Sequence, residues 1–158
     1  MKRWMLNALR MSVALIGIII LGFLLFWLPD IANGFAISDS GYAYLRYLLL
    51  AGLYATAIPF YLGIFHTFKL IKLIEKDGAF TEDACKSLGS ISIYSMTVIV
   101  LYILGMIFLN INNAAQPGIF LLGILIIFVA FIISIFAAIL KGLLMKVVEI
   151  KDENDFTI

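Results

Sequence analysis

Four long runs of apolar residues constrain this chain more than any other feature of its sequence. They cover residues 11–28, 45–68, 88–109 and 118–140, and the last run contains no charged side chain. An α-helix rises about 1.5 Å per residue, so about 20 apolar residues are enough to cross the roughly 30 Å hydrocarbon core of a bilayer. The pattern therefore predicts four membrane-spanning helices.

The composition agrees with a membrane location. The 158 residues are 64% hydrophobic and the mean hydropathy is +1.12, which is more apolar surface than a soluble domain of this size can bury. The runs also lack the alternation of polar and apolar residues that is typical of membrane β-strands. We therefore predict an all-α fold, a four-helix transmembrane bundle that forms a single integral membrane domain over residues 1–158.

The positive charges predict how the bundle is oriented. Ten of the 11 Lys and Arg residues lie before the first run, between the second and third, or after the fourth; they are Lys2, Arg3, Arg10, Lys69, Lys72, Lys76, Lys86, Lys141, Lys146 and Lys151. Only Arg46 lies on the other side. Because Lys and Arg favour the cytoplasmic side, we expect a multi-pass protein of the cell membrane with both termini and the central loop in the cytoplasm. A net charge of +1 gives no indication of direct binding to nucleic acid.

The amino terminus allows a second interpretation. The segment MKRWMLNALR has the basic flank of a secretory signal peptide, and Ala32-Asn33-Gly34 loosely resembles a cleavage site. However, the apolar run that follows is longer than a typical signal core and ends at Pro29-Asp30. We expect this run to remain as a membrane anchor.

Two of the helices are predicted to extend into the cytoplasm. The segment KLIKLIEKDG is amphipathic, so we expect the second helix to continue to Gly78. A new helix should then begin after Thr81, which is a suitable N-cap, with Glu82 and Asp83 in its first turn. The fourth helix should continue into a cytoplasmic tail of residues 141–158, because charged and apolar residues there separate onto different helical faces.

Small and hydroxyl-bearing residues mark two expected helix contacts. On the second and third runs these residues are Ala51, Gly52, Ala55, Thr56, Ser87, Ser90, Ser92, Ser95 and Thr97. Small residues let membrane helices approach closely, and hydroxyl groups can hydrogen-bond between helices. We expect these residues to pack helices together rather than to line a solute pathway.

The chain lacks the residue sets that catalysis or metal binding requires. His66 is the sole histidine and Cys85 the sole cysteine, and neither has sequence partners for a nucleophilic triad or a metal cluster. No Asp, Glu, Lys or Arg lies near the middle of a run, whereas ion-coupled transporters generally need such groups there. We predict that the protein is not an enzyme and binds no metal or cofactor.

The central loop and the last residues carry a resemblance to a known family. The residues concerned are Gly78, Phe80, Thr81 and Glu82 in the loop, and Glu153, Asn154, Asp155, Phe156, Thr157 and Ile158 at the end. With four spans, this pattern resembles a family of small bacterial membrane proteins of unknown function, whose chains typically end Glu-Asn-Asp-Leu-Thr-Ile. Phe156 replaces the usual leucine, a conservative apolar change. The resemblance implies that the gene lies beside one for a small Cro-type helix-turn-helix regulator.

Two interpretations of the segment 153–158 remain open at this stage. In the first, Asn154 and Asp155 end the last helix while Phe156 and Ile158 pack back against the other helices. In the second, Glu153 to Ile158 form a recognition segment for a cytosolic partner.

Three hypotheses for the function follow from the sequence. The leading one is a membrane-embedded regulator that binds a small cytosolic transcription factor, such as the helix-turn-helix regulator. The alternative is a pore or small-solute carrier that forms by self-association in the lipid bilayer. The weakest is an enzyme that acts on lipid, for lack of catalytic residues.

Overall fold

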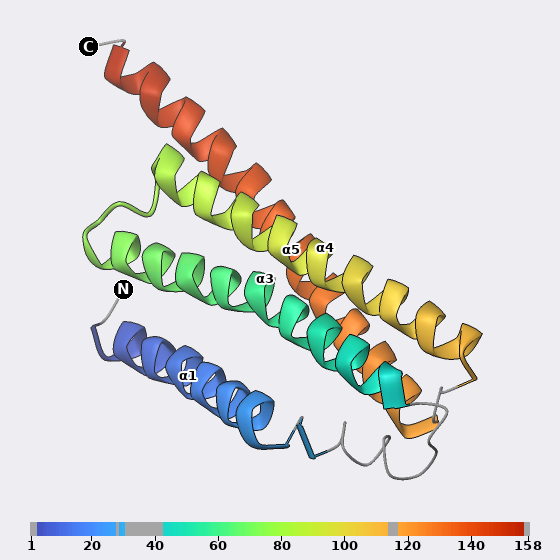
Figure 1. Ribbon diagram of the computed structural model, residues 1–158. Helices are drawn as coiled ribbons and strands as arrows, with labels where there is room; N and C mark the ends of the chain where they lie inside the picture. Colours follow the sequence, from blue (N-terminus) through green and yellow to red (C-terminus); the bar gives the residue numbers. More distant parts are fainter. Residues whose placement is uncertain (1–2, 28, 31–42, 114–116, 157–158) are drawn as a thin grey trace.

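The structure is a computed structural model that describes residues 3–27, 29–30, 43–113 and 117–156 (Figure 1). Helix α1 covers Arg3–Gly22 and continues as a short π-helix, η1, over Phe23–Trp27. Helices α3, α4 and α5 cover Ala43–Glu75, Glu82–Ile111 and Pro117–Phe156. Four helices are long and apolar enough to cross a membrane, so the predicted all-α fold with four spanning helices is confirmed.

The helices pack in the order in which they occur in the chain. The main contacts join α1 to α3, α3 to α4, and α4 to α5, and successive helices run in opposite directions (Figure 1). The starts of α1 and α4 and the ends of α3 and α5 therefore lie at one end of the molecule (Figure 1). Because most of the Lys and Arg side chains lie there, we call it the cation-rich end.

Helix α3 ends earlier than its amphipathic pattern predicts. The expected end was Gly78, but the last helical residue is Glu75. Asp77 adopts a left-handed conformation with φ 58°, and the amides of Asp77 and Gly78 donate to the carbonyls of Ile74 and Leu73. This is the hydrogen-bond pattern of a Schellman motif, which satisfies the last carbonyls of a helix and turns the chain away.

Helix α4 begins as the sequence predicts. Thr81 has extended backbone angles, and its Oγ1 accepts a hydrogen bond of 3.3 Å from the amide of Ala84. Glu82 and Asp83 occupy the first turn, where the helix dipole favours negative charge. The predicted N-cap is confirmed.

Close packing joins α4 to α5 along a row of small residues on α5. Gly123, Ala130, Ser134 and Ala137 are buried. The Ser134 Oγ donates to the Ser92 carbonyl at 3.0 Å, and the Ser92 Oγ donates to the Ser134 carbonyl at 2.9 Å. The two helices can approach this closely because the residues between them are small.

Most of the small residues on the second run, which we expected to form a helix contact, do not do so. Ala51, Gly52 and Ala55 are exposed, and an added Cβ at Gly52 would meet no atom within 4 Å. The expectation that these three residues form a helix contact is wrong, whereas Thr56, the fourth residue of the predicted set on this run, is half-buried and hydrogen-bonds Tyr102 of α4. On α4, by contrast, Ser87 is buried and Ser92 bonds across to α5.

Candidate partner-binding segment

The end of α5 projects past the other helices at the cation-rich end (Figure 1). Leu144 and Val148 are the last half-buried side chains of this helix, and every described residue from Glu149 to Phe156 is exposed. The cause is the difference in length between the two paired helices. Helix α4 begins only at Glu82, whereas α5 continues past that level to Phe156. The last two turns of α5 therefore have no covering helix among the described residues.

The predicted recognition segment lies in these last turns. Glu153, Asn154, Asp155 and Phe156 are all helical and exposed, so the helix does not end at Asn154 or Asp155 as the packing interpretation expected. The ring of Phe156 is 89% exposed and does not pack back onto the helices. Thr157 and Ile158 lie outside the described residues. The segment therefore presents one aromatic ring on an acidic helix end.

A lysine lies within the contact between α4 and α5, before the last half-buried residues of α5. Lys141 is half-buried and lies across α4 at Gly89, where an added Cβ would be 3.0 Å from the lysine Nζ. A lysine stem can cover apolar surface while its ammonium group stays near the polar boundary. Glycine at position 89 leaves room for it. Beyond this contact the sequence of α5 becomes rich in charge, and Asp152, Glu153 and Asp155 make its end acidic.

One ion pair holds α1 at the same end of the molecule. The Arg10 guanidinium donates to the Glu75 carboxylate, with 2.7 Å between Nη2 and Oε2. Glu75 lies beyond residue 68, where the second apolar run ends, and Arg10 precedes the first. The hydrogen bond and the positive charge of Arg10 lower the pKa of Glu75, and Arg3 and Lys76 add to this effect.

The two residues with potential for chemistry are not part of any recognisable site. His66 is half-buried and its ring stacks on Tyr94, with 5.6 Å between the ring centroids. Its Nδ1 atom is buried without a hydrogen-bond partner, and Cys85 is a buried free thiol. Among the described residues, no group of three His, Cys, Asp or Glu side chains could hold a metal ion.

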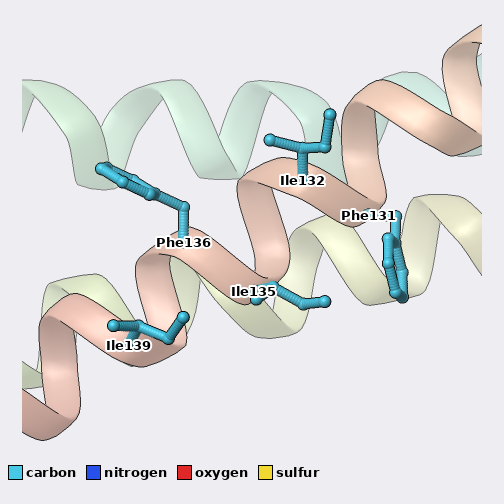
Figure 2. Close-up of a pocket in the computed structure, with 5 residues that line it drawn as sticks. All are labelled: Phe131, Ile132, Ile135, Phe136 and Ile139. Atoms are coloured by element: carbon cyan, nitrogen blue, oxygen red, sulfur yellow. The ribbon is translucent and has the colours of Figure 1, made fainter.

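A hollow on the surface of α5 is also without polar lining. It has a volume of about 200 Å³ and is lined by Phe131, Ile132, Ile135, Phe136 and Ile139. Figure 2 shows that all five side chains come from a single helix, α5. The hollow is therefore a shallow groove on the outside of α5 rather than a cavity between helices, and it offers no groups for catalysis.

Sequence reasoning missed two features of this region. One is the Arg10–Glu75 pair, whose members are far apart in the sequence and become neighbours only when α1 packs on α3. The other is the seam of α5, because Gly123, Ala130 and Ala137 are small apolar residues within a uniformly apolar run. Gly123, Ala130, Ser134 and Ala137 follow one another at intervals of seven, four and three residues. This spacing places them on one helical face and could have identified them.

Comparison with known proteins gives a family and a relative. Residues 30–158 match the family described as "Protein of unknown function (DUF2975)". The chain is 38% identical over 160 residues to "Uncharacterized membrane protein YoaS" of Bacillus subtilis (strain 168), with 100% of both chains covered. No solved structure matches. The family match includes α3, α4 and α5 but begins after η1.

Proposed function

The chain belongs to this family of proteins of unknown function (DUF2975), and we propose that it anchors a small cytosolic protein to the membrane through the end of α5. The observation that carries the proposal is the exposure of Phe156 at the tip of a helix that projects beyond its neighbours. Burial of a phenylalanine side chain stabilises a complex by about 1.5 to 3 kcal/mol. An aromatic ring at such a tip is therefore suited to anchor a partner.

The charge of the segment indicates the chemistry of the partner. Asp152, Glu153 and Asp155 surround Phe156 and no Lys or Arg follows Lys151. A complementary surface would carry Lys or Arg residues around an apolar pocket, because complementary charge speeds association and selects among partners. Small helix-turn-helix regulators have basic surfaces for binding DNA phosphates. Such a regulator, of the kind that the sequence resemblance led us to expect, is the partner that we propose.

The proposal requires the cation-rich end to face the cytoplasm, with both termini inside. The distribution of Lys and Arg supports this orientation. A reporter fused after Ile158 or within residues 76–81 should be cytosolic, whereas one within residues 32–40 should be outside the cell. The reverse pattern would exclude a cytosolic partner for α5.

Deletion of Glu153 to Ile158 tests the proposal. The full chain in detergent should retain the purified helix-turn-helix regulator, and the shortened chain should not. Thermal stability should be nearly equal in the two forms, because the described residues of the deleted segment are exposed. Equal retention by both forms would contradict the proposal, and so would a large loss of stability, which would mean that the segment closes the bundle.

Other functions have weaker support in the described part of the chain. The side chains of Ser92 and Ser134 lie in the seam between α4 and α5, but they bond to each other's helices and do not line a path. We therefore do not favour the pore or carrier. That the protein is not an enzyme remains a prediction.

A further inference from the structure

The face of α5 that points away from α4 carries a continuous apolar stripe. Its members follow one another at intervals of three or four residues, and each is exposed by 41% or more: Leu121, Leu125, Phe128, Ile132, Phe136, Ile139, Leu143, Val147 and Ile150. On a helix these intervals place the residues on one side. The residues that contact α4, such as Ala130 and Ser134, lie on the opposite side. We call the exposed set the outer stripe of α5.

The outer stripe does not end where the apolar run ends. Leu143, Val147 and Ile150 are 56%, 41% and 60% exposed, and all three follow residue 140. Lys141, Lys146 and Lys151 lie among them, which places this part of the helix at and beyond the polar boundary of the bilayer. Lipid chains cannot cover these three side chains there, and their exposure to water is unfavourable.

We infer that the outer stripe is the surface through which α5 pairs with α5 of a second copy of this chain. Lipid can cover only the part of the stripe before residue 140, and a water-soluble protein can cover only the part after it. Both parts of the stripe can be covered by another helix that leaves the bilayer at the same level along its length as α5 does. The α5 helix of a second copy has this property, and two copies inserted in the same orientation bring their stripes together in parallel.

The size of the stripe is close to what a specific interface requires. Residues 121–150 form about 45 Å of helix that is roughly 10 Å wide, so two copies would cover on the order of 900 Å² in projection, near the ~1,000 Å² expected of a specific interface. The groove lined by Ile132, Phe136 and their neighbours lies on this side of α5 (Figure 2) and gives a second helix a place for its side chains. Inside the bilayer, packing would drive the association, and beyond it the hydrophobic effect would.

Single cysteines at adjacent positions test this pairing. In a Cys85→Ser background, which removes the sole cysteine, Val147→Cys lies on the outer stripe. Val148→Cys is the matched control, because Val148 is the same residue type but is half-buried on the α4 side. Under mild oxidation in membranes with low expression, Val147→Cys should give mainly disulfide-linked dimer and Val148→Cys mainly monomer. Equal cross-linking of the two variants, or no cross-linking of Val147→Cys, would overturn the inference.

The mass of the purified protein gives an independent readout. The natural chain in lipid nanodiscs or mild detergent should have the mass of a dimer, and the double variant Leu143→Glu and Ile150→Glu should be a monomer with unchanged helix content. A monomeric natural chain would overturn the inference. The pairing does not rest on the proposed cytosolic partner, since Phe156 is not part of the stripe. Loss of regulator binding in a protein that still dimerises would refute only the proposed function.

Discussion

The contact between α4 and α5 differs in kind from the contact between α1 and α3. In the first, Ser92 and Ser134 each donate to the other's backbone carbonyl, and small residues hold the two backbones close together. In the second, long side chains of α3 bridge the space: Tyr61 donates to the Gly17 carbonyl of α1 at 2.8 Å, and Tyr54 donates to the Leu24 carbonyl of the adjoining η1 at 2.9 Å. Small buried residues recur along the α4–α5 contact, at Gly123, Ala130, Ser134 and Ala137.

The difference indicates which part of the molecule is the structural core. The α4–α5 contact lies within the range that matches the family, whereas α1 lies before it. A tightly packed helix pair can support the projecting end of α5 in a fixed direction, whereas the contact of α1 with α3 is less extensive and buries only Leu6 and Gly17 among the described residues of α1. We therefore expect changes in the α4–α5 seam to cost far more stability than changes between α1 and α3.

The largest effect is expected for Ser134→Leu. Ser134 is only 2% exposed, so a leucine there would force the helices apart and remove both bonds with Ser92. The combined cost should be about 2 to 4 kcal/mol, measured as the free energy of unfolding in mixed detergent. Ala138→Leu is the control, because Ala138 is exposed on the same helix, and it should change stability little. Equal effects would show that α4 and α5 are not closely packed.

Two glycines test the packing of α4 against α5 with a smaller expected loss of stability. An added Cβ at Gly123 would lie 2.9 Å from the Met106 sulfur, whereas one at Gly105 would meet nothing within 4 Å. Gly123→Val should therefore destabilise the protein by about 1 to 3 kcal/mol through overpacking. Gly105→Val should have a much smaller effect. If the melting temperature falls equally in the two variants, the contact between Gly123 and Met106 does not limit packing.

A smaller loss is expected from Tyr61→Phe, which removes one hydrogen bond between α3 and α1. Hydrogen bonds between membrane helices contribute about 0.6 kcal/mol on average, so global stability should fall only slightly. The local effect should be clearer, because amide hydrogen exchange around Gly17 should become faster while exchange around Ser134 stays unchanged. Faster exchange at both places would mean that α1 is as much part of the core as α5.

The smallest effect concerns the ion pair between Arg10 and Glu75 and depends on pH. The pKa of Glu75 is lowered in the folded protein, so the pair stabilises the fold above the unfolded pKa of glutamate. That stabilisation is lost as pH falls through the lowered folded value. The melting temperature of the natural chain should decrease slightly over this acidic range relative to Arg10→Ala, and the two should converge at the lowest pH. If the melting temperatures of the natural chain and of Arg10→Ala differ by the same amount at every pH, the ion pair does not contribute to stability.

The sequence predicts the membrane helices well because long uncharged runs have few other stable structures. The start of α4 could also be predicted, since Thr81 followed by Glu82 and Asp83 is a local capping signal. The end of α3 could not, because the amphipathic pattern continues past Glu75 while Asp77 adopts a left-handed conformation. Aspartate accepts that conformation more readily than most residues, but the sequence alone does not require it.

Helix contacts were harder to predict than helices. Ala51 and Gly52 are as small as Gly123 and Ala130, yet the first two are exposed and the last two are buried. Residue size permits close approach but does not determine which face meets a neighbour in an apolar solvent. For the candidate segment, the sequence identified residues 153–158 but left open whether Phe156 packs inward. The length of α5 relative to α4 decides the position of Phe156.

The most direct test of the proposed function compares two phenylalanines at the cation-rich end. Phe156 lies at the tip of α5, and Phe80, which is 54% exposed, lies in the connection between α3 and α4. Binding of the purified helix-turn-helix regulator should be measured for Phe156→Ala and Phe80→Ala in nanodiscs. We expect Phe156→Ala to raise the Kd by at least about 30-fold, equivalent to about 2 kcal/mol of lost burial, and Phe80→Ala to leave it unchanged. Equal Kd values for Phe156→Ala and the natural chain would contradict the account.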